Sequence, residues 1–140
     1  MIKIKTNASR VSLKLKNAGN IDTTDLMREI AGDLEDVTAT AFEKEQDPVT
    51  GRPWKRLKPS TIAARRRIGK WPGKKLQVFG ALVSSITSSF SRTKARIGTS
   101  IKYSIYNQVT RRFIGLSRTH VKKLKKKSAR FVIKRLRRLK

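Results

Sequence analysis

The stretch DPVTGRPWKRLKPST, residues 47–61, separates two halves of opposite charge. All nine acidic residues of the chain lie between Asp22 and Asp47, where only two basic residues accompany them, so this window carries a formal charge of −7. From Pro48 to Lys140 the chain has no acidic residue and 28 Lys and Arg. The stretch also holds three of the four prolines, which do not continue helices or central strands. We therefore expect it to form an ordered connector between an acidic half and a basic half.

Trp54 lies in the middle of this connector and is one of only two tryptophans. A large aromatic side chain in a proline-rich loop usually anchors that loop on a hydrophobic core. We expect Trp54 to pack inward and Lys55, Arg56 and Lys58 to face solvent. For a side chain of this kind, plain core packing is a more common role than direct contact with a partner.

The composition indicates one ordinary domain with an extreme charge. A chain of 140 residues can bury about two-thirds of its unfolded surface. Its net charge of +26 must be offset by a polyanion, by an acidic neighbouring subunit or by salt. The chain has no cysteine and a single histidine, His120, which excludes disulfides and disfavours a zinc site, so we expect no cofactor. No window approaches eighteen apolar residues and the N-terminus lacks a signal-peptide pattern, so we expect a soluble protein made in a cytoplasm, without membrane association.

The hydrophobic pattern predicts an α+β fold. Alternating apolar and polar residues over 2–5 and 11–16, with turn residues between them, predict an N-terminal β-hairpin. Over residues 22–46, apolar residues recur every three or four positions, which predicts a long amphipathic helix with an acidic outer face. Asp22 would cap this helix, and Asp25 would interact favourably with its dipole. The expected apolar stripe consists of Leu26, Ile30, Leu34, Val37, Ala41 and Phe42.

The acidic face of this helix has two interpretations. It could be an ordinary solvated surface, or it could dock the basic half of a neighbouring subunit. A chain with this much positive charge gains unusually from placing its few acids in one strip, so both interpretations stay open.

Beyond the connector, the sequence predicts short elements around a small antiparallel sheet. Ser60 could cap a short helix over 61–67 that stops at Gly69. The mostly apolar residues 76–86 predict another short helix. Two short strands are expected over 87–91 and 94–99, then a helical turn over 103–108 and a loop over 110–117. Their inward positions would be held by Phe90, Ala95 and Ile97.

The last segment, residues 118–140, has 12 basic residues in 23 and a regular apolar stripe. This pattern predicts a basic helical extension about 35 Å long, attached to a single α+β domain over residues 1–117. Its cations could contact phosphates or an acidic protein, and an anionic membrane ranks last because the rest of the chain has the pattern of a folded scaffold. The expected polyanion or partner contacts are Arg118, Lys122, Lys123, Lys126, Lys127, Arg130, Lys134, Arg137 and Arg138.

Residues suited to catalysis are scarce. His120 lies among basic residues, which suppress its action as a general base, so a surface or phosphate-contacting role fits better. The pairs Glu29 with Asp33 and Asp22 with Asp25 have helical spacing, but no third ligand or glycine-containing loop accompanies them, so ordinary acidic surface fits better than a metal site. A phosphate-binding loop motif is absent. We expect a protein that is not an enzyme.

The connector belongs to an ordered set of residues that extends over 41–117. The members of this structural motif are Phe42, then Asp47, Pro48, Gly51, Pro53, Trp54 and Leu57, then Thr61, then Gly80, Leu82, Ser85 and Ile86, then Ile97, Gly98 and Thr99, then Tyr103, and finally Arg112, Phe113, Ile114, Gly115, Leu116 and Ser117. In this order and spacing the chain resembles the phage virion morphogenesis family, the tail completion proteins of Mu-like and related contractile-tailed phages.

The resemblance implies a structural virion protein at the head-proximal end of a tail. Such a protein would be assembled in the host cytoplasm and would form a homo-oligomeric ring, with a hexamer favoured, that completes tails or joins them to heads. Its neighbours would be head-tail connector proteins and tail terminator or tube proteins, with non-specific contact to DNA in the channel. The positive charge fits this role, because basic surfaces there would meet phosphates or acidic rings.

The alternative is a basic nucleic-acid-binding protein of the ribosomal or nucleoid type. Such a protein would bind duplex DNA or RNA tightly as a monomer, with an affinity that falls steeply with salt. Ring formation with weak binding would favour the virion protein instead.

Overall fold

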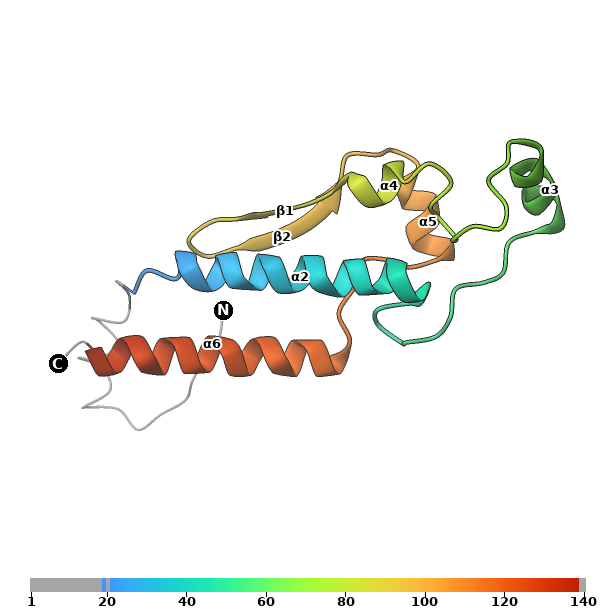
Figure 1. The fold of residues 1–140 in the computed structure, drawn as a ribbon. Helices are drawn as coiled ribbons and strands as arrows, with labels where there is room; N and C mark the ends of the chain where they lie inside the picture. Colours follow the sequence, from blue (N-terminus) through green and yellow to red (C-terminus); the bar gives the residue numbers. More distant parts are fainter. Residues whose placement is uncertain (1–18, 20, 139–140) are drawn as a thin grey trace.

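The computed structural model describes residue 19 and residues 21–138. A long helix, α2 (Thr24–Lys44), lies between a two-stranded sheet on one side and a second long helix, α6 (Arg118–Arg138), on the other (Figure 1). The expected α+β class is confirmed. The predicted hairpin over 2–5 and 11–16 lies outside the described residues, as do the last two residues of the basic extension.

Helix α2 matches the amphipathic pattern, but its cap differs from the prediction. Thr23, not Asp22, holds the N-cap position, and its side chain makes no capping hydrogen bond. The Asp22 carboxylate instead accepts hydrogen bonds from the Thr24 backbone N–H, at 2.9 Å, and from the Thr24 hydroxyl. The hydroxyl bond holds the pKa of Asp22 below its usual value. Asp25 lies in the first turn, as expected.

The short helix α3 (Pro59–Arg67) begins earlier than predicted. Ser60 is inside the helix and does not cap it, because Pro59 holds one of the first helical positions and Lys58 is the N-cap. Proline is favoured there, since its fixed φ suits the first turn and its missing N–H would have no partner. The helix ends just before Gly69, whose φ of +67° is left-handed, as the breaker predicted.

The expected helix over 76–86 is mostly wrong. Only α4 (Ala81–Ser84) is helical, and it begins after Gly80, whose φ of +73° is incompatible with a continuous right-handed helix. Leu76 also has a positive φ, of 59°, so residues 76–79 form a loop.

The two predicted strands are present, with ends shifted by at most one residue. Strand β1 (Ile86–Phe90) pairs antiparallel with β2 (Ala95–Thr99), and the sheet packs on α2. Ala95 and Ile97 are half-buried, but Phe90 does not point inward and is 43% exposed. It lies at the tip of the hairpin, where little of the core is within reach, and the Arg28 guanidinium lies 5.3 Å from its ring centre.

The core is small and lies at the C-terminal end of α2. Phe42 packs edge-on against Trp54, with ring centres 5.5 Å apart, and its ring centre is 5.3 Å from that of Phe113. Leu82 and Ala41 complete this cluster. Helix α5 (Ser104–Thr110), which the sequence predicted as a turn, precedes the loop that carries Phe113. Helix α6 contributes no buried residue among those described, although Leu124, Phe131, Val132 and Leu136 of its apolar stripe are half-buried.

Candidate functional surfaces

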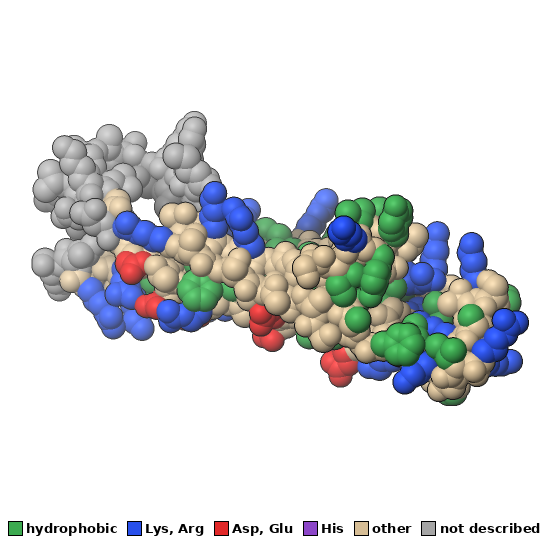
Figure 2. Space-filling model, turned by 90° about the horizontal axis from the view of Figure 1, so that it is seen from above, with side chains coloured by type: hydrophobic (Ala, Val, Ile, Leu, Met, Phe, Trp, Pro, Cys, Tyr) green, Lys and Arg blue, Asp and Glu red, His purple; other side chains and the backbone are tan. Residues whose placement is uncertain are grey.

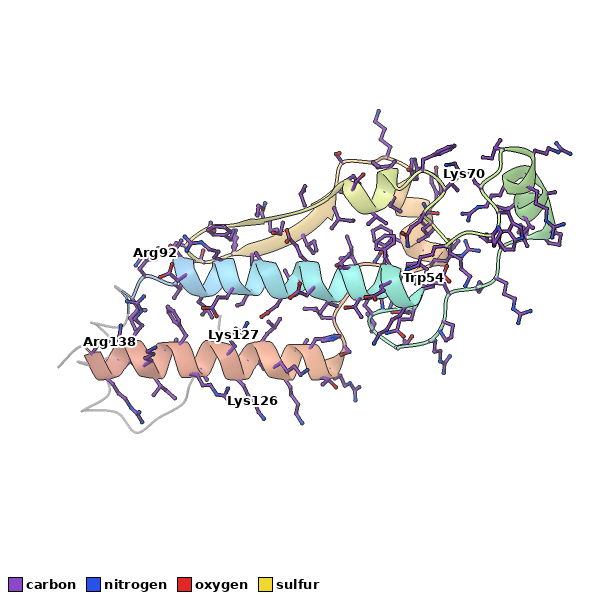
Figure 3. All side chains as sticks on the ribbon, in the orientation of Figure 1. Trp54, Lys70, Arg92, Lys126, Lys127 and Arg138 are labelled. Carbon is purple, nitrogen blue, oxygen red and sulfur yellow. The ribbon has the colours of Figure 1, made fainter. Side chains whose placement is uncertain are left out.

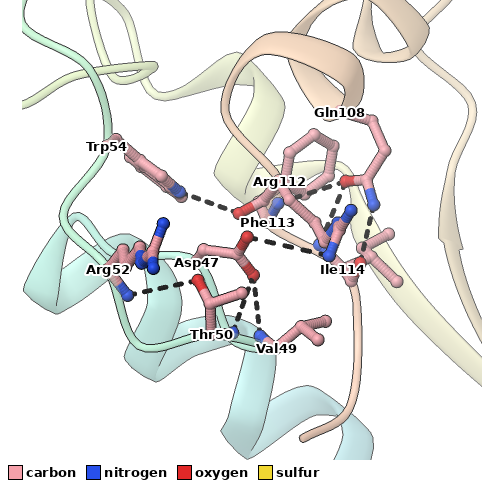
Figure 4. Close-up of polar contacts among 9 residues, drawn as sticks. All are labelled: Asp47, Val49, Thr50, Arg52, Trp54, Gln108, Arg112, Phe113 and Ile114. Atoms are coloured by element: carbon pink, nitrogen blue, oxygen red, sulfur yellow. Dashed lines mark hydrogen bonds and ion pairs between the residues drawn. The ribbon is translucent and has the colours of Figure 1, made fainter.

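The connector is a rigid turn, as its composition predicted. The Asp47 carboxylate accepts hydrogen bonds from the backbone N–H groups of Val49, at 2.7 Å, and Thr50, at 3.4 Å (Figure 4). The Asp47 N–H donates to the Arg52 carbonyl at 2.8 Å, and the Asp47 carbonyl accepts from Gly51, whose φ is +71°. These local hydrogen bonds restrict the backbone of the turn to one conformation. The turn can therefore hold Trp54 in a fixed position.

Trp54 joins the connector to the loop that follows α5. Its side chain is 4% exposed, and its Nε1–H donates to the Arg112 carbonyl at 2.8 Å (Figure 4). The Arg112 guanidinium lies 3.7 Å from the Asp47 carboxylate. A Cβ placed on Gly115 would lie 2.5 Å from Val49, so only glycine allows this close approach. Two segments that are far apart in the sequence therefore form one junction.

Gln108 is the junction residue that the sequence did not reveal. Its side-chain oxygen accepts from the backbone N–H groups of Phe113 and Ile114, both at 3.1 Å, and its amide nitrogen donates to the Ile114 carbonyl at 2.6 Å (Figure 4). One glutamine on a short helix has no distinctive spacing, and only the fold shows that it holds this loop.

The residues of the expected structural motif divide between two places. The junction brings together Asp47, Pro48, Gly51, Trp54, Arg112, Phe113 and Gly115, with Leu116 half-buried in the same loop. Pro53 forms an isolated β-bridge with Gln46 beside this turn. Leu57, Gly80, Leu82 and Tyr103 instead line a groove between α3, α4 and α5.

The acidic face of α2 is partly occupied by the chain's own α6. Lys127 lies between the two helices and pairs with Asp33, and it is 4.0 Å from Glu29 (Figure 3). Arg135, two turns further along α6, lies 3.4 Å from Asp25, two turns back along α2. The two helices therefore run antiparallel in a register that ion pairs help to fix. These exposed or half-exposed pairs each stabilise the contact by about 0.2–1 kcal/mol.

The predicted contact residues of α6 lie on more than one side of the helix. Lys134 and Arg138, for example, line a hollow together with Asp25 and Glu29 of α2. Lys126 lies on the outer side of the helix, whereas Lys127 faces inward (Figure 3). Within residues 21–138, no ion pair involves the predicted contacts other than Lys127. The predicted contacts that are exposed and form no ion pair within this range are Arg118, Lys122, Lys123, Lys126, Arg130, Lys134, Arg137 and Arg138.

His120 stabilises the start of α6. Its Nδ1 accepts from the Ser117 backbone N–H at 3.2 Å and lies 2.9 Å from the Ser117 hydroxyl, which in turn accepts from the His120 N–H. The imidazole is therefore engaged with the helix terminus and has a structural role. No group of three potential metal ligands is found in the described part of the chain, and no helix there is long and apolar enough to cross a membrane.

Comparison with known proteins decides the family. The sequence profile of the phage virion morphogenesis family matches residues 3–125. The chain is a member of that family. The match is longer than the 41–117 over which the resemblance was visible, and it includes the N-terminal region and the beginning of α6.

This family member also has a relative in Escherichia phage Mu, named "Putative capsid assembly protein G". The two sequences are 33% identical over 107 residues, which cover 75% of this chain and 68% of the Mu protein. No solved structure matches the chain. The family assignment and this relative give the chain a role in the assembly of a phage virion.

Proposed function

We propose that the chain is a tail completion subunit of the neck, where the tail of the phage meets the head. In this proposal it acts without catalysis, as a homo-oligomeric ring, most simply a hexamer, that finishes the tail and helps to join it to the head. Its neighbours are head-tail connector proteins on one side and tail terminator or tube proteins on the other. One observation carries the proposal: the junction around Trp54 is held by many contacts, whereas the basic helix α6 lies apart from it and contributes no buried residue among the residues described.

The junction gives the subunit a fixed shape. Trp54, Phe42 and Phe113 lock the connector onto the end of α2, and the Asp47 and Gln108 bonds hold the two loops. A ring requires each subunit to present the same surface in the same orientation, and such a locked centre meets that need.

Helix α6 gives the subunit a polyanion-binding surface. Nine exposed cations are distributed along a helix about 30 Å long, with no acid on that helix to neutralise them. DNA in the channel or an acidic neighbouring ring would offset this charge. If α6 binds DNA, the affinity should fall as salt rises. A plot of log affinity against log salt concentration should steepen by about 0.9 for each phosphate that a cation neutralises.

Contacts between subunits must overcome the repulsion between chains of charge +26. The acids that remain exposed on α2 and have no ion-pair partner within residues 21–138 are Glu35, Asp36 and Glu43. We propose that they face basic surface of the next subunit. On this proposal, the part of the acidic face of α2 that α6 does not cover docks a neighbouring subunit.

Ring formation and DNA affinity together test the proposal against its alternative. Negative-stain microscopy of the purified full-length protein should show rings, and its affinity for duplex DNA should be weak near physiological salt. A monomer that binds duplex DNA tightly, with a steep salt dependence, would instead identify a nucleic-acid-binding protein, an alternative that the exposed cations of α6 keep open.

A further inference from the structure

A second surface, which combines exposed apolar side chains with a basic rim, lies between α3, α4 and α5. It surrounds a groove of about 530 Å³, whose apolar walls include Leu57, Leu76, Val78 and Phe79. The groove is separate from α6, since no residue of that helix lines it. It also shares no residue with the Asp47–Arg112 junction, and the proposed function leaves it without a role.

Large apolar side chains next to this groove are exposed to solvent. Phe79 is 76% exposed at the groove itself. Ile105, Tyr106 and Val109 do not line the groove, but they are 70%, 77% and 83% exposed on α5, whose Asn107 and N-cap residue Tyr103 do line it. Figure 2 shows hydrophobic side chains gathered at this end of the molecule. Contiguous apolar surface with a polar rim usually marks a binding site for another macromolecule.

The rim of the groove is basic, and its lining includes no acid. Lys58, Arg65 and Arg111 line it, and none of them forms an ion pair within the described residues. The Arg111 guanidinium is held by the Lys55 and Arg56 carbonyls, at 3.0 and 3.1 Å. These backbone bonds orient the guanidinium but leave its charge without a counterion.

Arg65 is the most informative of these cations. It is only 5% exposed, its Nη1 donates to the Lys74 carbonyl at 2.9 Å, and its buried Nε has no hydrogen-bond partner within residues 21–138. Burying a guanidinium that forms no ion pair is costly unless something compensates its charge. A carboxylate brought to the groove by a partner would supply that compensation.

The charge pattern of this chain argues against its own N-terminal segment, and against a second copy of the chain, as the occupant of the groove. Residues 1–18 contain five basic residues and no acid, so the N-terminal segment has the wrong charge. All nine acids of a second copy lie between Asp22 and Asp47, and none of the exposed large hydrophobic residues lies on α2. Among the described residues, the exposed Phe90 lies beside α2 against the Arg28 guanidinium, so a second copy offers one apolar ring near its acids but no apolar helix face.

From these observations we propose that the groove and the exposed face of α5 bind an acidic amphipathic segment of a different protein. Its large apolar side chains would cover Phe79, Ile105 and Val109, and its Asp or Glu side chains would pair with the basic rim. The aliphatic side chains of Ile105 and Val109 favour a protein partner, since they offer bases no ring to stack on. Phe79 and Tyr106 are exposed rings that could stack on bases, and the DNA competition below tests that alternative.

A panel of synthetic peptides and the full-length protein test this proposal. The labelled probe is a short peptide that places Leu and Phe on one helical face and Glu elsewhere. One control peptide has Gln in place of every Glu, and another keeps the composition but scrambles the order. The amphipathic acidic peptide should bind saturably, and both controls should bind at least about tenfold more weakly, because each lacks either the charges or the apolar face.

Matched variants locate the binding site. The double variant Ile105→Ser/Val109→Ser should weaken the acidic peptide by about tenfold or more, since truncation of central apolar contacts has the largest effect. Lys58→Gln should weaken it a few-fold and reduce its salt dependence. Ile133→Ser and Lys126→Gln, which change comparably exposed residues of α6, should leave the affinity unchanged. All these side chains are exposed, so the variants are expected to fold, and circular dichroism checks this.

Three results would overturn the proposal. The first is the absence of saturable binding by the acidic amphipathic peptide. The second is equal binding of the scrambled peptide, which would show that net charge alone attracts it. The third is displacement of the peptide by single-stranded DNA whose own binding is weakened by Ile105→Ser/Val109→Ser, which would assign this surface to nucleic acid.

Discussion

Replacing Trp54 by Phe tests the energetic role of the junction most sharply. Phenylalanine keeps an aromatic ring against Phe42 but removes the Nε1–H that donates to the Arg112 carbonyl at 2.8 Å. Loss of this hydrogen bond costs about 1 kcal/mol, and the smaller ring leaves a space in a site that is 4% exposed. We expect Trp54→Phe to lower the free energy of unfolding by about 2 kcal/mol, and Trp54→Ala by about 4 kcal/mol.

The assay is urea unfolding followed by far-ultraviolet circular dichroism, with Trp71→Phe as the matched control. Trp71 is half-buried, and no hydrogen bond of its indole is found within the described residues. The same chemical change there should cost less than about 1 kcal/mol. If Trp54→Phe destabilises the protein no more than Trp71→Phe does, then the Trp54–Arg112 bond does not hold the connector in place.

Three further predictions concern other elements. Gly115→Ala should destabilise the protein by about 1–3 kcal/mol, because the new Cβ would lie 2.5 Å from Val49. Gly32→Ala in α2, where nothing lies within 4 Å of the new Cβ, should stabilise it by about 0.5–1 kcal/mol. Urea unfolding measures both, and a change of the same sign in both variants would refute the packing argument. The lowered pKa of Asp22 in the folded chain means that its contribution to stability is present above the unfolded value of about 4 and is lost as the pH falls, so Asp22→Asn should make acid unfolding shallower. An unchanged acid limb would contradict that. Deletion of residues 118–140 should leave the junction folded, because α6 contributes no buried residue, and should prevent incorporation into particles; normal incorporation of the shortened chain would show that α6 is not the attachment element.

Elements with a regular local pattern could be predicted from the sequence. Helix α2 and helix α6 were found because apolar residues recur along them with helical spacing, and the strands because of their composition. The burial of Trp54 followed from a large aromatic in a proline-rich stretch. Each of these inferences uses residues that are close together in the chain.

Features that depend on distant residues could not be predicted. Lys127 has the same spacing on α6 as the other cations, and only the antiparallel docking on α2 turns it towards Asp33. Gln108 and Arg65 carry no pattern that distinguishes them from surface residues, although the first holds a loop and the second is buried. The apolar composition of residues 76–79 predicts helix, because composition does not reveal the positive φ of Leu76.

Electron microscopy of particles made without this protein tests the central claim most directly. A phage genome with a stop codon early in this gene would be induced in its host, and the particles examined with and without the full-length chain supplied from a plasmid. The account predicts normal filled heads and separate, unjoined tails, with joined particles restored by the plasmid. Absence of heads, or joined particles without the protein, would contradict a role in completing the tail at the neck.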